Sequence, residues 1–129
     1  MELYIGGVGQ GKLDYVLEEH KEEKLHIVDP DSFEELLENE AGTRIIFNDF
    51  HLWIRKLLQE GNIPDEAAEK LFHKYPDCIV ISDEIGNGLV PMEALEREYR
   101  ERTGRILIKA AEQAERVERI ICGLGQRLK

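Results

Sequence analysis

Residues 6–13, GGVGQGKL, have the composition of a phosphate-binding loop. Gly6, Gly11 and Lys12 stand where the pattern G-x-x-x-x-G-K-[ST] places its two glycines and its lysine. In such a loop the backbone N–H groups and the start of the following helix hold phosphate, and the lysine reaches the terminal phosphates. The alternative is a strand-to-helix turn whose glycines serve packing alone, and the pattern by itself does not decide between the two.

The last position of the loop departs from the pattern. Leu13 stands where a serine or threonine hydroxyl would bind magnesium. Because that hydroxyl serves the metal during phosphoryl transfer, whereas the loop amides hold the phosphate, we expect phosphate binding to suffer less than catalysis. The requirement for Mg²⁺ stays open. Asp14 is interpreted as an acid favoured by the helix dipole, with a substitute metal ligand as the alternative.

Short apolar runs alternate with amphipathic segments along the chain. The expected strands are ELYIG (2–6), KLHIVD (24–29), TRIIFND (43–49), DCIVISDE (77–84) and ERIICGLG (118–125). Helices are expected between them, over 12–23, from Ser32 to near Gly42, over 50–60, over 63–76 and along a longer segment from Leu95 to Val117. Alternation of this kind predicts an α/β fold with a mainly parallel sheet of about five strands and helices on both faces.

The composition indicates a soluble globular chain that forms a single domain over residues 1–129. A net charge of -10 disfavours nucleic acid as a partner, and no apolar run is long enough for a membrane span, so we expect a cytoplasmic protein. Cys78 and Cys122 lie in apolar runs and are predicted to be buried, reduced thiols. The four histidines lack metal-ligand spacing, which predicts no structural zinc.

The C-terminal third carries a more specific pattern. VISDEIGNGLVP, the later TGR and the closing CGLG resemble the adenosylcobinamide kinase/adenosylcobinamide-phosphate guanylyltransferase family of cobalamin biosynthesis, whose pattern is approximately [ST]-N-E-[VI]-G-x-G-[IV]-V-P, R-x-x-x-G-R-x-N-Q and V-x-G-[IL]. The matching positions are Ser82, Glu84, Ile85, Gly86, Gly88, Leu89, Val90, Pro91, Gly104, Arg105, Gly123 and Leu124. GGVGQGK is similar to the family's phosphate loop, and HLWIRKLL is similar to its T-x-W-x-x-N-L-L segment.

The resemblance implies a three-layer, RecA-like P-loop fold and an oligomeric protein. In this family ATP or GTP phosphorylates adenosylcobinamide, and GTP then guanylylates a histidine before GMP moves to the corrinoid phosphate. The implied partners are therefore a purine nucleotide, a corrinoid such as adenosylcobinamide and further copies of the chain. The nucleotide phosphates would lie against Gly6, Gly7, Val8, Gly9, Gln10, Gly11, Lys12 and Leu13.

This chain departs from the family where the chemistry takes place. Asn48 stands at the acidic position that ends the third strand, and Asp83 replaces an asparagine. Leu107 and Ile108 replace the Asn-Gln pair, and the chain has no histidine between Pro30 and Asn48 to accept guanylate. We therefore expect weak kinase activity and loss of guanylyl transfer. The alternative is a degenerate, non-catalytic binding or regulatory protein on the same fold.

Three residues are candidates for the chemistry that remains. Lys12 would contact phosphate. Asp49 would bind the metal in place of the acid missing at Asn48, one residue beyond the usual position, and its alternative role is a helix N-cap. Glu84 would approach the ligand from a glycine-rich loop, with a purely structural turn as the alternative. His51 is interpreted as a surface or core histidine, with a site-facing position as its alternative.

Overall fold

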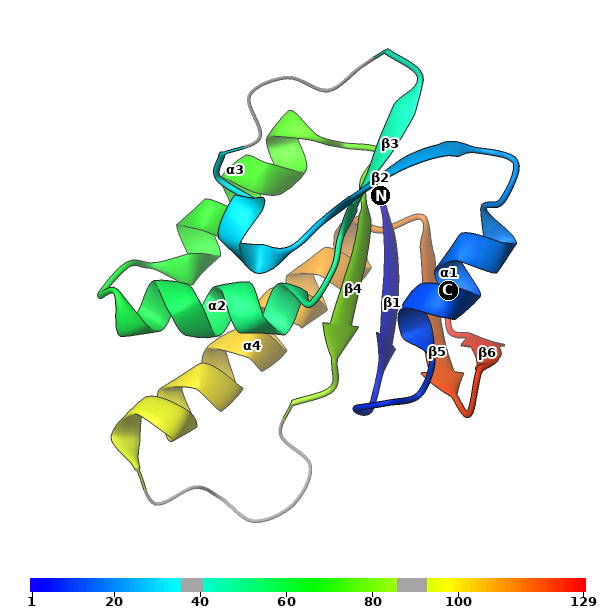
Figure 1. Ribbon diagram of the computed structural model, residues 1–129. Helices are drawn as coiled ribbons and strands as arrows, with labels where there is room; N and C mark the ends of the chain where they lie inside the picture. Colours follow the sequence, from blue (N-terminus) through cyan, green and yellow to red (C-terminus); the bar gives the residue numbers. More distant parts are fainter. Residues whose placement is uncertain (36–40, 86–92) are drawn as a thin grey trace.

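A computed structural model describes residues 1–35, 41–85 and 93–129, and these residues form a six-stranded sheet with helices on both faces (Figure 1). The strand order is β2-β3-β4-β1-β5-β6. All neighbouring pairs are parallel except β5 and β6. The strands are β1 (Glu2–Gly6), β2 (Lys24–Val28), β3 (Thr43–Phe47), β4 (Ile79–Asp83), β5 (Arg116–Ile121) and β6 (Leu124–Arg127). The α/β fold and the mainly parallel sheet are as predicted.

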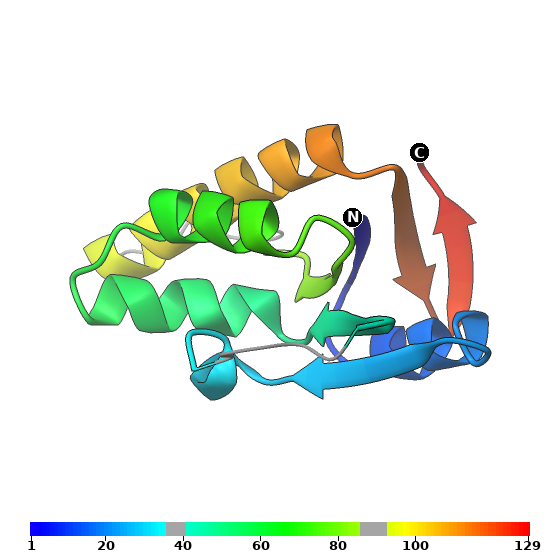
Figure 2. The same cartoon turned by 90° about the horizontal axis from the view of Figure 1, so that it is seen from above.

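The helices divide unequally between the two faces of the sheet (Figure 2). One face carries α2 (Phe50–Gln59), α3 (Pro64–Lys74) and α4 (Ala94–Gln113), and the other carries α1 (Lys12–Glu19). Consecutive residues of a strand pack on opposite faces of the sheet: Ile45 packs with α2 and α3, whereas Ile46 packs with α1. Both are buried because a parallel sheet is covered on its two sides, which explains the uninterrupted apolar run in β3.

The carboxyl ends of β1 and β4 form the natural ligand crevice of this topology. The chain leaves β1 into α1 on one face of the sheet and leaves β4 toward α4 on the other. Because β1 and β4 are hydrogen-bonded neighbours, this is the point where the winding of the sheet reverses, and open α/β sheets bind ligands at such a point. The loop after β1 and the residues that end β3 and β4 therefore meet at one edge.

Three elements differ from the sequence-based expectation. The long helix expected from Leu95 to Val117 ends at Gln113, and Val117 lies in β5. In the range of the helix expected from Ser32 to near Gly42, Ser32 ends the 3-10 turn η1 (Pro30–Ser32), residues 33–35, 41 and 42 form turns, and residues 36–40 lie outside the described residues. The closing strand is a hairpin of β5 and β6, since Cys122 (φ 51°) and Gly123 (φ 74°) both adopt the left-handed conformation and reverse the chain in two residues.

The hairpin also corrects the prediction for the cysteines. Both are free thiols, but Cys122 is exposed at the tip of the turn, whereas Cys78 is buried beside β4. The prediction that both are buried was therefore wrong for Cys122. Burial raises the pKa of Cys78 to about 12, because a thiolate is poorly solvated inside the core.

We predict that the two thiols differ sharply in reactivity. At about pH 8, iodoacetamide should alkylate Cys122 at least about 100-fold faster than Cys78. The thiolate is the reactive form, and burial disfavours the thiolate of Cys78. Peptide mass spectrometry over a time course measures both rates in one sample. Labelling in denaturant is the control and should bring the rates together. Equal rates in the folded protein would contradict the placement of Cys78 in the core.

Candidate phosphate site

Residues 7–11 connect β1 to α1 by a path that needs glycine. Gly9 (φ 68°) and Gly11 (φ 83°) both have left-handed backbone conformations, which strain any residue with a Cβ. Val8 at the tip of the loop is 81% exposed, and α1 begins directly at Lys12 with Gly11 as its N-cap. The loop and the helix N-terminus therefore have the arrangement that the sequence pattern predicts.

The β5–β6 hairpin holds the loop from the side. The N–H of Cys122 donates to Oε1 of Gln10 at 2.7 Å, and the N–H of Gly123 donates to the carbonyl oxygen of Gln10 at 2.8 Å. Gly6 itself lies so close to β5 that a Cβ there would come within 2.5 Å of the Ile120 carbonyl oxygen. The shape of the loop is thus fixed by a strand pair about 110 residues further along the chain.

The side chain of Lys12 turns back toward the loop, where an ion pair balances its positive charge. Its Nζ donates to the Gly7 carbonyl oxygen at 2.7 Å and lies 2.7 Å from Oδ1 of Asp83. The side chain of Lys12 is 8% exposed and that of Asp83 is 14% exposed. Little water screens this ion pair, so it is a stronger contact than a surface salt bridge.

His51 in the first turn of α2 fixes Asp83 from the other side. The backbone N–H of Asp83 donates to Nδ1 of His51 at 3.0 Å, and Nε2 lies 3.3 Å from Oδ2 of Asp83. These two contacts assign the proton of a neutral imidazole to Nε2. Burial lowers the pKa of His51 and outweighs the opposing effect of the Asp83 carboxylate, which is consistent with the neutral form.

A pocket of about 400 Å³ joins the loop to the ends of β3 and β4. The described residues that line it are Val8, Gly9, Gln10, Gly11, Lys12, Leu13, Asp14, Asn48, Asp49, Ile81 and Asp83. Asp49 occupies the N-cap position of α2 in a left-handed conformation (φ 54°), and its side chain makes no capping hydrogen bond to the described residues. The carboxylate of Asp49 is therefore available to the pocket.

The residues of this pocket suit a magnesium ion only if phosphate and water complete its coordination. Leu13 contributes no oxygen, and its side chain packs partly buried on the apolar cluster beneath α1. Within the described part of the chain, no group of three or more His, Cys, Asp or Glu side chains could hold a metal ion alone. Because Mg²⁺ is commonly bound by one or two carboxylates together with phosphate and water, Asp49 and Asp83 fit that limited role.

Glu84 does not join this pocket, although it follows Asp83 directly. Oε1 of Glu84 lies 2.7 Å from Nε of Arg119, and Nη2 of Arg119 donates to Oε2 at 3.0 Å. The Glu84 N–H donates to the Gly6 carbonyl oxygen at 2.8 Å, which extends the pairing of β4 with β1. Its carboxylate is thus directed at β5, and the glycine-rich segment 86–92 that follows lies outside the described residues.

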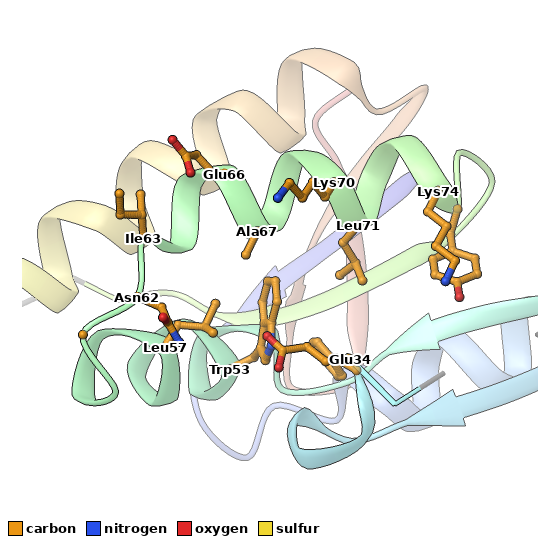
Figure 3. A pocket seen from close by; sticks show the side chains of 13 residues that line it. Glu34, Trp53, Leu57, Asn62, Ile63, Glu66, Ala67, Lys70, Leu71 and Lys74 are labelled. Carbon is orange, nitrogen blue, oxygen red and sulfur yellow. The ribbon is translucent and has the colours of Figure 1, made fainter. Parts of the chain in front are cut away.

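A larger cavity of about 670 Å³ is lined by residues of α2 and α3 and by Phe33 and Glu34, which follow η1 (Figure 3). Its floor is formed by the buried side chains of Phe33, Trp53, Leu57 and Leu71, and its rim carries charged residues such as Glu34 and Lys70. None of the three candidate catalytic residues lines it. We therefore place the candidate site at the smaller pocket, where backbone amides, a lysine and carboxylates converge.

Comparison with known families gives one match. The family model for cobinamide kinase / cobinamide phosphate guanyltransferase matches residues 16–128. The chain belongs to this family. The match begins four residues after Lys12, so the phosphate loop is supported by its own pattern and conformation rather than by the matched segment. A search of curated proteins found no match.

Within the described residues, no helix has the length and apolar character required to cross a membrane.

Sequence reasoning misses two members of the site. From the sequence, Asp83 is interpreted as a replacement for an asparagine and His51 as a surface or core residue. The structure pairs Asp83 with Lys12, and it pairs His51, which is buried, with Asp83. The available signal for Asp83 is its place at the end of a predicted strand, where side chains reach the ligand edge of a parallel sheet. No sequence signal pairs His51 with Asp83, because 32 residues separate them.

We predict that Gly6→Ala destabilises the protein by roughly 1–3 kcal/mol, because the added methyl group would collide with the backbone of β5. Gly104→Ala is the matched control: it lies in α4, and a Cβ added there would have no described atom within 4 Å apart from its chain neighbours and the nearby backbone of its own helix. The control should stabilise the helix by about 0.5–1 kcal/mol. Urea denaturation measures both changes, and an unaffected Gly6→Ala variant would contradict the close approach of β1 and β5.

Proposed function

We propose that this chain binds a purine nucleoside triphosphate at residues 6–13 and acts on adenosylcobinamide as a weak kinase without guanylyltransferase activity. The observation that carries the proposal is the position of Lys12 and the left-handed glycine loop at the carboxyl end of β1, in a chain that belongs to the cobinamide kinase family. Family membership further supports a cytoplasmic homo-oligomer.

Binding would depend mainly on the main chain. The N–H groups of the loop and of the first turn of α1 supply fixed donors, and the helix N-terminus carries a partial positive charge. Lys12 supplies a full positive charge at the same place. Because the backbone donors do not depend on the identity of residue 13, Leu13 leaves this part of the site intact.

Phosphoryl transfer depends on side chains more than nucleotide binding does. A bound Mg²⁺ ion would neutralise charge on the transferring phosphate, and Asp49 and Asp83 are the residues that would hold it. Asn48 and Leu13 add neither charge nor a hydroxyl. Loss of one preorganised charge-stabilising group commonly costs roughly 10²- to 10³-fold in rate, which supports a weak kinase.

The proposed loss of guanylyl transfer follows from the segment that carries the guanylylated histidine in the family. The segment between Pro30 and Asn48 has no histidine, and the histidine that does lie near the loop, His51, uses both ring nitrogens on Asp83. A neutral imidazole engaged in this way is a positioning group rather than a nucleophile.

A second candidate function is a non-catalytic nucleotide-binding or regulatory protein. The specific observation in its favour is the closed Lys12–Asp83 ion pair, since a lysine held by an internal carboxylate contributes less to phosphate binding. The two candidates share the phosphate site and differ in turnover.

We predict that Lys12→Ala weakens binding of ATP and GTP at least about tenfold, because it removes the positive charge closest to the loop. Isothermal titration calorimetry with each nucleotide, in the presence of magnesium, measures the change. Lys109→Ala is the matched control, since Lys109 lies half-exposed on α4 beside Glu69. The proposed function is wrong if the unaltered protein binds neither nucleotide at millimolar concentration.

We predict that Leu13→Ser raises phosphoryl transfer at least about tenfold, because it restores the missing hydroxyl to the loop. Transfer of radiolabelled γ-phosphate to adenosylcobinamide gives the rate. Leu17→Ser is the matched control, since Leu17 packs on the same apolar cluster from the same helix but does not line the pocket among the described residues. No transfer by either the unaltered chain or Leu13→Ser would favour the non-catalytic function.

A further inference from the structure

The pocket beside the loop contains a carboxylate that competes with phosphate for Lys12. Asp83 lies 2.7 Å from the Lys12 ammonium, which is the distance at which a phosphate oxygen would bind the same group. The Gly7 carbonyl oxygen accepts a second bond from that ammonium at 2.7 Å. A phosphate that enters the pocket must therefore share Lys12 with Asp83 or displace it.

The charges that face the pocket make this competition costly for a bare nucleotide. Asp14, Asp49 and Asp83 line it together with Lys12. With His51 neutral, these side chains carry more negative than positive charge. A nucleoside triphosphate without a cation would add several negative charges to a partly buried, weakly screened space.

Asp83 cannot simply leave the pocket when phosphate arrives. Its backbone N–H and its Oδ2 are both engaged by His51, which is itself buried in the first turn of α2. The carboxylate therefore stays where it is, and release of Lys12 leaves Oδ1 without a counter-charge. A divalent cation is the partner that restores neutrality there, and a carboxylate oxygen is a ligand that Mg²⁺ prefers.

We propose that Asp83 makes nucleotide binding depend on a divalent cation. In the empty pocket, the Asp83 carboxylate pairs with Lys12. When the metal–nucleotide complex enters, the carboxylate binds the cation instead, and Lys12 is released to the phosphates. This inference rests on the proposed function, because it concerns the same pocket. His51 is then a positioning residue that holds the Asp83 carboxylate where it can contact either Lys12 or the metal.

The test is a linkage experiment on four proteins. Calorimetric titrations with GTP and with ATP, each in excess MgCl₂ and in EDTA, are made with the unaltered chain, Asp83→Asn, Asp49→Asn and Asp29→Asn. Asp29 is the matched control, because it is an exposed aspartate at the start of η1 and does not line the pocket among the described residues.

Magnesium should tighten binding to the unaltered chain and to Asp29→Asn by about tenfold or more, within the usual range of coupling between two ligands. Asp83→Asn should bind the metal-free nucleotide about tenfold more tightly and show a magnesium effect below about twofold. Asp49→Asn should reduce the magnesium effect without the gain in metal-free affinity, because the contacts of Lys12 involve Asp83 and Gly7 rather than Asp49.

Several results would overturn the inference while leaving the proposed function in place. Equal affinity of the unaltered protein in EDTA and in magnesium contradicts the inference without any variant. A full magnesium effect in Asp83→Asn, or weaker metal-free binding in that variant, contradicts it as well. Circular dichroism checks folding, and Asp83→Ser replaces the asparagine variant if that one does not fold. Failure of the unaltered chain to bind either nucleotide with magnesium would instead refute the proposed function.

Discussion

The register between β1 and β4 is the constraint on which the site depends. Parallel pairing sets Gly6 opposite Asp83, so the last residue of each strand reaches the same edge of the sheet. Six residues beyond Gly6, the chain has turned through the glycine loop and brings Lys12 back against Asp83. A shift of one residue in this register would turn Asp83 to the other face and separate the ion pair.

The opposite side of β1 shapes the loop itself. The pairing of β1 with β5 allows no side chain at Gly6, and the β5–β6 turn supplies the backbone donors that hold Gln10. The conformation of residues 7–11 is thus determined by contacts from the C-terminal end of the chain. This arrangement explains how a loop with an altered final residue can keep the glycine-dependent shape on which the proposed phosphate binding rests, since Leu13 takes no part in those contacts.

Helix α2 connects the site to the main core. His51 on its first turn reaches Asp83, and Trp53, two residues later, is buried against Phe33 and Phe50 with ring centroids 5.4 and 5.5 Å away. The aromatic cluster fixes the position of the helix because large rings lose contact area with small displacements. The position of His51, and through it that of Asp83, therefore depends on the packing of apolar side chains outside the phosphate pocket.

The sequence by itself determined the alternation of strands and helices, the glycine loop and the family, because these depend on local periodicity and on residues close together in the chain. It placed Lys12 correctly at the start of a helix. It extended the third strand to Asp49, whereas β3 ends at Phe47 and Asp49 occupies the N-cap position of α2, which was its alternative. It could not determine that Lys12 pairs with Asp83, that His51 completes the group, or that Glu84 is held by Arg119, since these partners lie between 32 and 71 positions apart. It also placed Cys122 inside a strand, because an apolar run does not reveal a two-residue turn. Strand order and register decided these points, and they arise from pairing between distant segments rather than from any local preference.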